Sequence, residues 1–183
     1  MTTAAADTLR ALRRTRQVRE FTSQPVDAAD LDAIANVGRW SGSSQNSQPW
    51  RFIVLTQVDV LREIAEIGLP QTRSLRSATA AIAIVLPVTE DDRHELGVAY
   101  DDGRAAERIL IAAGMLGLGA GIAWIRPDVR PAIGGLLGLP ADRYIRTIIS
   151  LGRPTEAALA PKAAPGEARL PRDESIFRDR WPG

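Results

Sequence analysis

The sequence predicts a layered domain of mixed α and β structure with about four to five strands and a proline-rich C-terminal arm. Segments with helical spacing alternate with short apolar, β-branched runs through residues 1–151. One run, AAIAIVL at 80–86, is almost wholly apolar, as expected for a strand covered on both faces. After Gly152 this periodicity stops and five prolines follow. We therefore expect one domain over 1–151 and an arm over 152–183.

The first 40 residues contain two helical patterns separated by an extended segment. Residues 8–16 have the spacing of a helix with one apolar side. Residues 21–26 are expected to be extended, because Pro25 disfavours the α region for the residue before it. Asp27 is a suitable N-cap for a helix whose apolar face runs over 31–38.

A polar loop precedes the first predicted strand. Residues 41–49, SGSSQNSQP, contain no large apolar side chain and cannot form part of a core. Residues 50–56, WRFIVLT, are rich in β-branched and aromatic residues, which predicts a strand. A short helix is predicted at 60–67, before the apolar strand at 80–86.

The second half begins with a predicted polar loop at 88–97, in which His94 is expected to lie at the surface. A long helix follows at 101–116, and Asp101 and Asp102 are expected to cap its start. The remaining predicted elements are a strand at 120–126, a helix from Asp128 to Leu137, and a strand at 144–151.

The composition excludes several kinds of active site. The chain has 183 residues, no cysteine and one histidine. Disulfides, cysteine nucleophiles, iron–sulfur clusters and multi-histidine metal sites are thereby excluded, and no metal site is predicted. The formal net charge is +1, which indicates no general affinity for nucleic acid or membrane surfaces.

No segment predicts a membrane span or a secretory signal. The N-terminal residues lack the apolar run of a signal peptide. The longest uncharged apolar stretch, 109–125, is interrupted by four glycines and is shorter than the ~20 residues that a membrane helix needs. We therefore expect a cytoplasmic protein.

Five arginines lie within ten residues near the N-terminus. They are Arg10, Arg13, Arg14, Arg16 and Arg19. Three interpretations are open: a solvated helix face, a nucleic-acid patch, or a site for one small polyanion such as a nucleotide phosphate. The loop at 41–49 favours the third, because Asn46 and Gln48 can each donate and accept hydrogen bonds, as the edge of a heterocycle requires. The glycine cluster GLGAG at 117–121 lacks the spacing and the strand-then-helix order of a dinucleotide-binding turn.

Four segments together resemble the nitroreductase family of FMN-dependent oxidoreductases. They are TRQVREF and QPV within 15–26, SGSSQNSQPWRFIVL at 41–55, DDGRAAERILIAAGMLGLGAGIAWI at 101–125, and SLGRP at 150–154 with ARLPRDE at 168–174. The segments occur in the family's order and span nearly the whole chain.

The resemblance implies an α+β fold of three layers, in which helices flank a mixed, mainly antiparallel central sheet and an extended C-terminal arm wraps the partner. It implies a homodimer with two FMN sites at its interface. It also implies that NADH or NADPH reduces the FMN, which passes electrons to a nitroaromatic, a quinone or a similar small acceptor. Because the flavin carries the redox chemistry, we assign no catalytic residue.

The resemblance assigns cofactor-binding roles to residues from both ends of the chain. Arg16 and Gln17 would face the ribityl-phosphate end of FMN. Arg19 would lie by the pyrimidine end, where a fixed cation stabilises negative charge. Arg169, in the arm, would pair with the phosphate.

Further cofactor contacts are implied in the polar loop and in one strand. Asn46 would hydrogen-bond the pyrimidine edge, and Ser43 and Ser44 would contact the cofactor beside it. Backbone groups of Ala123 and Trp124 would lie by the hydride-accepting nitrogen of the flavin.

The sequence departs from the family pattern at several positions. Thr15 stands where an arginine is usual, Gln17 where a serine is usual, Glu167 where a basic residue is frequent, and Gly42 where a proline is expected. Arg13 or Arg14 could supply the missing charge at Thr15, and Lys162 or Arg172 could offset Glu167. Two alternatives remain: a flavin- or deazaflavin-binding protein with little turnover, and a basic module that binds nucleic acid.

Overall fold

A four-stranded antiparallel sheet forms the centre of the molecule in the computed structural model, which describes residues 2–161 and 169–181. The strands are β1 (Arg51–Leu55), β2 (Ala80–Pro87), β3 (Gly119–Trp124) and β4 (Arg143–Gly152). Their order across the sheet is β1-β2-β4-β3, so β1 and β3 are the two edge strands. All three pairings are antiparallel.

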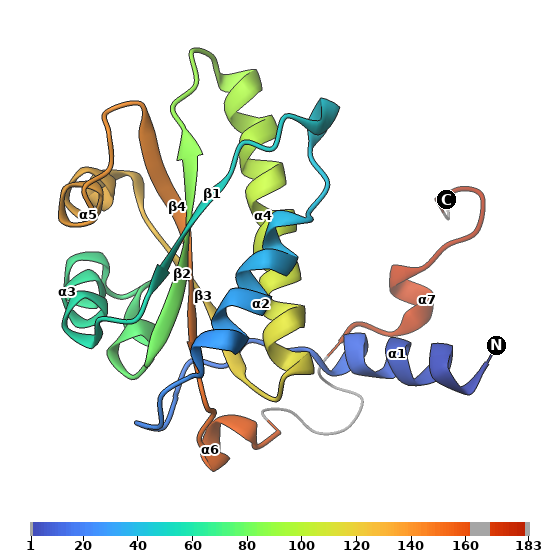
Figure 1. The fold of residues 1–183 in the computed structure, drawn as a ribbon. Coiled ribbons are helices and arrows are strands. Elements are labelled where there is room, and N and C mark those ends of the chain that lie inside the picture. The colour runs from blue at the N-terminus through green and yellow to red at the C-terminus, as the bar shows by residue number, and fades with distance from the viewer. Residues whose placement is uncertain (1, 162–168, 182–183) are drawn as a thin grey trace.

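Helices cover both faces of this sheet, as Figure 1 shows. On one face lie α2 (Ala28–Arg39) and α4 (Asp92–Met115). On the other lie α3 (Val58–Gly68), the short helix η2 (Arg73–Arg76) and α5 (Arg130–Leu136). Two further single turns, η1 (Ser44–Asn46) and η3 (Pro127–Val129), interrupt the connecting loops. The expected α+β fold of three layers is confirmed, and the described sheet is wholly antiparallel where a mixed, mainly antiparallel one was expected.

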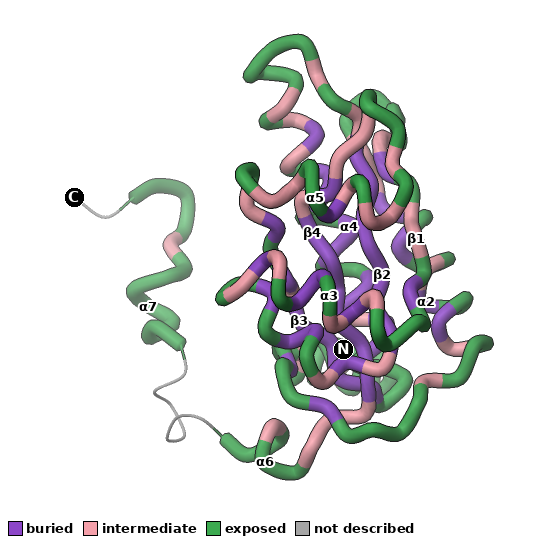
Figure 2. The backbone as a smooth tube through the Cα atoms, turned by 90° about the vertical axis from the view of Figure 1, so that its left-hand side faces the viewer, coloured by how far each residue is buried: buried purple, intermediate pink, exposed green. Residues whose placement is uncertain are grey.

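The apolar run of β2 supplies both cores, because successive side chains of a strand point to opposite faces. Ile82 and Ile84 pack into the core beneath α2 and α4, whereas Ala81 and Ala83 pack into the core beneath α3 and α5. Figure 2 shows this strand buried along its length.

The two ends of the described chain leave this body. Helix α1 (Thr3–Arg14) contains no buried residue, although Leu9 and Leu12 lie on it. After β4 come two short helices, α6 (Glu156–Leu159) and α7 (Arg172–Ser175). Figures 1 and 2 both show α7 apart from the sheet and its covering helices. The division into a domain over 1–151 and an arm over 152–183 remains a prediction.

The predicted loop at 88–97 is wrong, because α4 begins within it. The side chain of Asp91 accepts a hydrogen bond from the His94 backbone N–H at 2.8 Å and caps the helix there. Asp101 and Asp102 therefore lie inside a 24-residue helix and cap nothing. Among the described residues, no helix has the length and apolarity needed to cross a membrane.

Candidate functional site

The segment after α1 runs beside the edge strand β3. The backbone N–H of Val18 donates to the carbonyl of Ala120 at 2.7 Å. Gly121 permits this approach, because a Cβ atom there would overlap the carbonyl oxygen of Val18. Since side chains alternate along an extended segment, Gln17 and Arg19 project to one side of it and Arg16 to the other.

Gln17 is the centre of a small hydrogen-bonded group at this edge. Its side-chain oxygen Oε1 accepts from the Arg19 guanidinium at 2.7 Å and from the Ile122 backbone N–H at 3.3 Å. Both acceptor positions of that oxygen are thereby used, so the Gln17 amide nitrogen remains as the donor for a ligand.

A hollow of about 410 Å³ lies directly beside this group. Its lining residues come from three separate segments: Gln17, Arg19, Gln71, Arg73, Ile122 and Trp124. The lining combines two guanidinium groups, two carboxamides and one indole. These groups suit a flat, polar heterocycle that carries or develops negative charge.

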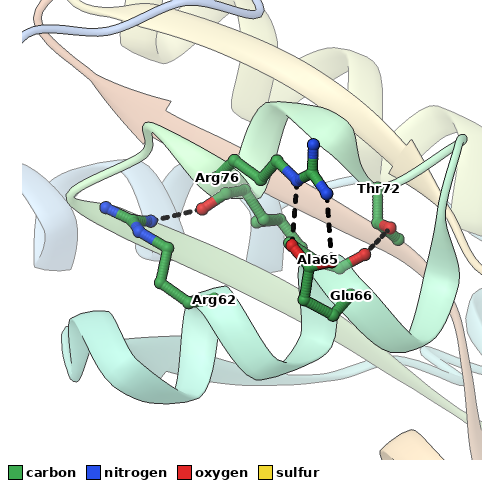
Figure 3. Close-up of polar contacts among 6 residues, drawn as sticks. Arg62, Ala65, Glu66, Thr72 and Arg76 are labelled. Carbon is green, nitrogen blue, oxygen red and sulfur yellow. Dashed lines mark hydrogen bonds and ion pairs between the residues drawn. The ribbon is translucent and has the colours of Figure 1, made fainter.

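The segment that carries Gln71 and Arg73 is held against α3 by side-chain bonds (Figure 3). The buried Thr72 hydroxyl donates to the carbonyl of Ala65 at 2.7 Å. Arg76 forms two hydrogen bonds to Glu66, at 2.9 and 3.0 Å, and this pairing lowers the pKa of the Glu66 carboxyl. The Arg62 guanidinium donates to the carbonyl of Leu75. These bonds position one wall of the hollow.

Arg126 orients the Gln71 side chain. Its guanidinium donates to the Gln71 Oε1 atom at 3.1 Å and to the carbonyl of Leu69 at 2.7 Å. It is itself fixed by two bonds to Asp128, at 2.9 and 3.0 Å. Because the Gln71 oxygen accepts from Arg126, its amide nitrogen is the group available to donate into the hollow.

A second hollow, of about 510 Å³, lies between α1 and the C-terminal end of α4. Arg10, Arg14, Thr15 and Arg16 contribute to its lining. The Arg16 guanidinium donates to the carbonyls of Ala158 and Ala160, at 3.1 and 3.2 Å, and to that of Leu159. Arg16 therefore contacts the arm, whereas Gln17 and Arg19 line the other hollow.

The polar loop lies elsewhere in this chain. Ser43, Ser44 and Asn46 precede β1, at the sheet edge opposite to β3, and none of them lines either hollow. Within the loop, the Ser43 hydroxyl accepts from the Gln48 N–H at 2.9 Å, and the Gln48 amide donates to Asn46 Oδ1 at 3.2 Å. Within a single chain, the predicted cofactor contacts therefore lie in separate places, some at the two hollows and the others in the polar loop at the opposite edge of the sheet.

The three remaining predicted residues differ in position. Trp124 is 39% exposed and lines the hollow with Arg19. The Ala123 side chain is buried in the core, and its backbone pairs with Ile148 in the sheet. Arg169 lies in the arm outside both hollows, and Lys162 and Glu167 lie outside the described residues.

Comparison with known proteins shows a likeness to one family. The model described as "Nitroreductase family" matches residues 12–83. A protein of Archaeoglobus fulgidus, provisionally named NADH dehydrogenase/NAD(P)H nitroreductase, is 28% identical over 171 residues, which are 91% of this chain and 94% of that protein. These matches show that the chain is similar to the nitroreductase family. An oxygen-insensitive NADPH nitroreductase of Helicobacter acinonychis is 32% identical over 92 residues, 49% of this chain and 44% of the relative.

Solved structures agree with the nitroreductase fold. An FMN-dependent nitroreductase from Clostridium difficile superposes with a TM-score of 0.78 at 24% identity, over 93% of this chain and 98% of that one. The hypothetical oxidoreductase YcnD from Bacillus subtilis superposes with a TM-score of 0.82 at 20% identity, over 97% and 75% of the two chains.

Sequence reasoning missed the positions of four polar residues of this chain. Gln71 and Arg73 lie in a segment that carries no motif, and only the fold brings them to β3. Asp101 and Asp102, which the sequence predicts as helix caps, are each only 2% exposed. Their position in the interior of a helix, ten and eleven residues after the N-cap Asp91, became visible only once the true start of α4 was known.

Asp102 is a buried acid with polar neighbours. Its Oδ2 atom accepts from the Thr147 hydroxyl at 2.7 Å, and the Arg146 guanidinium lies 4.0 Å away. Burial raises the pKa of Asp102 to about 6, because the loss of hydration outweighs the Thr147 hydrogen bond and the nearby Arg146 and Arg130 charges.

Proposed function

We propose that this protein is an FMN-dependent oxidoreductase that transfers electrons from NADH or NADPH to a nitroaromatic, a quinone or a similar small acceptor. The observation that carries the proposal is the hollow at β3, where Gln17, Arg19, Gln71, Arg73 and Trp124 converge. The match of residues 12–83 to the nitroreductase family model supports it, and so do the names of the relatives that span this chain.

The lining residues fit a flavin. The fixed amide nitrogens of Gln17 and Gln71 are donors for carbonyl and ring-nitrogen acceptors at a heterocycle edge. Arg19 and Arg73 provide positive charge where a flavin becomes negative on reduction. When bound, FMN supplies the redox chemistry, and this chain supplies binding, orientation and electrostatics.

Strand β3 contributes backbone groups as well. Ile122 directs its N–H away from β4 and toward Gln17. Because backbone groups alternate in direction along a strand, the Trp124 N–H faces the same edge, while that of Ala123 faces β4. In our proposal, the Trp124 N–H is the backbone donor nearest the hydride-accepting nitrogen of the flavin.

The phosphate end would be bound by cations from α1 and the arm. Arg14 lines the same hollow as Thr15, which makes it the better of the two neighbouring candidates to replace the arginine missing at that position. Arg16, which contacts the arm, and Arg169, which belongs to it, would add further positive charge for the phosphate. Arg16 already contacts the turn that ends α6.

The site would be completed by a second copy of the chain. Ser43, Ser44 and Asn46 lie at the opposite sheet edge and need a partner to meet the β3 hollow. The described surface offers apolar groups for such an interface: Leu9 and Leu12 on α1, Trp40 after α2, and Leu96 and Tyr100 on α4. Trp40 is 68% exposed and Tyr100 71%.

Flavin retention and reduction test the proposal. The purified protein is incubated with FMN, gel-filtered and examined by absorbance, and NADH or NADPH is then added without oxygen. We expect a retained flavin band that bleaches with at least one nicotinamide. A retained band that neither nicotinamide bleaches would favour the flavin- or deazaflavin-binding alternative. Absence of retained flavin, together with salt-dependent retention on DNA or RNA, would favour the nucleic-acid module.

A variant pair tests the residue assignment. Arg19→Ala should weaken FMN binding by roughly 10- to 100-fold, the range expected for loss of one hydrogen bond from a charged donor. Arg93→Ala is the control, since Arg93 is exposed on the first turn of α4 and lines neither hollow. Equal FMN affinity in both variants would refute the placement of the flavin at β3.

A further inference from the structure

A carboxylate with no role in the proposed chemistry holds the polar loop in place. Asp101 lies inside α4 and is 2% exposed. Its Oδ2 atom accepts a hydrogen bond from the backbone N–H of Ser44 at 3.0 Å, and its Oδ1 atom lies 3.4 Å from the Arg104 guanidinium. A carboxylate is costly to bury, so a position that retains one needs specific partners. Here a main partner is a loop amide.

The loop that Asp101 contacts has a conformation that its residues do not favour by themselves. Gln45, Asn46 and Gln48 have φ angles of 51°, 56° and 47°, in the left-handed region that residues with a Cβ atom disfavour. Such a backbone persists only when surrounding contacts determine it, and such residues cluster at ligand-binding positions. The Ser44 N–H is the one immediately before this left-handed stretch.

Arg104 provides the second contact between α4 and the loop. Its guanidinium packs against Gly42 so closely that a Cβ atom on Gly42 would overlap it. Gly42, which stands where a proline is expected, thus admits the side chain that pairs with Asp101. Loop, arginine and carboxylate therefore form one contact group.

We propose that Asp101 is a positioning residue of the flavin site, which binds the loop at 42–48 in the conformation that presents Asn46 to the cofactor. This inference rests on the proposed function. Asp101 would touch no cofactor atom, and its effect would pass through the Ser44 N–H and the Arg104 side chain.

The neighbouring Asp102 offers a matched control. It lies on the same helix with the same 2% exposure, but its hydrogen bond goes to Thr147 on β4, away from the loop. A general effect of removing a buried carboxylate from α4 would appear in both variants. An effect of losing the loop contact would appear only at Asp101.

The test compares Asp101→Ala, Asp101→Asn and Asp102→Ala in the full chain. Hydrogen–deuterium exchange of the peptide that contains Ser44 is measured without FMN, and FMN affinity is measured by fluorescence quenching. We expect Asp101→Ala to raise exchange in the loop and weaken FMN binding at least about tenfold. Asp101→Asn keeps an acceptor oxygen and should stay within about threefold of wild type. Asp102→Ala should leave both loop exchange and affinity near wild type.

A second variant keeps the test decisive if Asp101→Ala does not fold. Ser44→Pro removes the same N–H without altering α4, and proline is tolerated at the first position of a helical turn. Compared with Ser44→Ala, which loses the same hydroxyl but keeps the N–H, it should reproduce the faster exchange and the weaker binding.

Each outcome separates the inference from the proposed function. Unchanged loop exchange in Asp101→Ala, or faster exchange with unchanged FMN affinity, would overturn the positioning role while wild type still binds FMN. If wild type itself binds no FMN, the proposed function fails and the role of Asp101 in a flavin site fails with it. The exchange data then report only whether Asp101 orders the loop.

Discussion

The Arg19 guanidinium donates a 2.7 Å hydrogen bond to the side-chain oxygen of Gln17, and this pair fixes the polar edge of the β3 hollow. The same oxygen accepts from the Ile122 N–H at 3.3 Å, so the Gln17 amide has one orientation. In the family pattern a serine is usual at this position. Glutamine is longer, and it combines two tasks: it holds Arg19 and leaves an amide donor for the ligand.

Replacement of Gln17 by alanine should therefore cost more than one ligand contact. Gln17→Ala removes the amide donor and also frees Arg19, so we expect FMN affinity to fall roughly tenfold or more, the value of about one to two hydrogen bonds. Fluorescence quenching of FMN measures the affinity. Gln24→Ala, an exposed glutamine outside the lining residues, is the control. Unchanged affinity in Gln17→Ala would show that the amide does not face the cofactor.

The wall that carries Gln71 and Arg73 should depend on the buried Thr72 hydroxyl. Thr72→Val removes the bond to the Ala65 carbonyl and leaves that acceptor without its partner, which should destabilise the protein by about 1–3 kcal/mol. Thermal melts measure the change, and Thr56→Val, on the surface after β1, is the control. We also expect weaker FMN binding, since Arg73 follows Thr72 directly. A stability loss with wild-type FMN affinity would show that the segment with Gln71 and Arg73 does not contribute to FMN binding.

Stability should depend on pH through Asp102. The folded-state pKa of about 6 lies above its ordinary value of 3.8, so the folded protein binds this proton more tightly than the unfolded chain does. The resulting stabilisation is complete below pH ~4 and is lost as the pH rises through ~6, a change of roughly 3 kcal/mol.

The variant Asp102→Asn isolates this effect, because an amide keeps an acceptor for Thr147 and does not titrate. The difference in unfolding free energy between wild type and variant should shift in favour of the variant between pH 4 and pH 7. Urea unfolding at each pH measures it. A difference that stays constant with pH would show that Asp102 titrates normally.

Local sequence signals predicted most elements, and their failures have physical causes. The β2 strand and the absence of a helix over 21–26 were predicted correctly, because apolar content favours a buried strand and Pro25 disfavours the α region for the residue before it. The start of α4 was missed because Asp91 caps a first turn that is polar throughout, which resembles a loop in composition.

The site was predictable in part only. Gln17, Arg19 and Trp124 belong to motifs and line one hollow, whereas Arg16, which the resemblance placed beside Gln17 at the ribityl-phosphate end, lines the other. The cofactor contacts themselves stay a prediction. Gln71 and Arg73 reach that hollow through the packing of η2 against β3, which no local pattern encodes. The carboxylates Asp101 and Asp102 are buried by long-range packing, and burial of a charged residue is the outcome that sequence patterns predict least.

Because Arg19 and Asn46 lie far apart in one chain, we predict that two copies of the chain form each site. In one chain, Arg19 lies at the β3 edge and Asn46 precedes β1 at the other edge. If two copies form each site, Arg19 of one chain would act with Asn46 of the partner subunit. Arg19→Ala and Asn46→Ala, each made alone, should then impair both sites of a homodimer, because every site contains one substituted residue.

A heterodimer of these two variants distinguishes a shared site from a site within one chain. Co-expressed with different affinity tags and purified through both, it should contain one doubly substituted site and one with Arg19 and Asn46 intact. We expect it to retain about half the FMN of wild type after gel filtration, as two-fold symmetry requires, while either variant homodimer retains little. The control for aggregation is a mixture of the two homodimers, expressed separately and taken through the same two affinity steps. If both residues served a site within one chain, every site in the heterodimer would carry a substitution, and FMN retention would stay as low as in the homodimers.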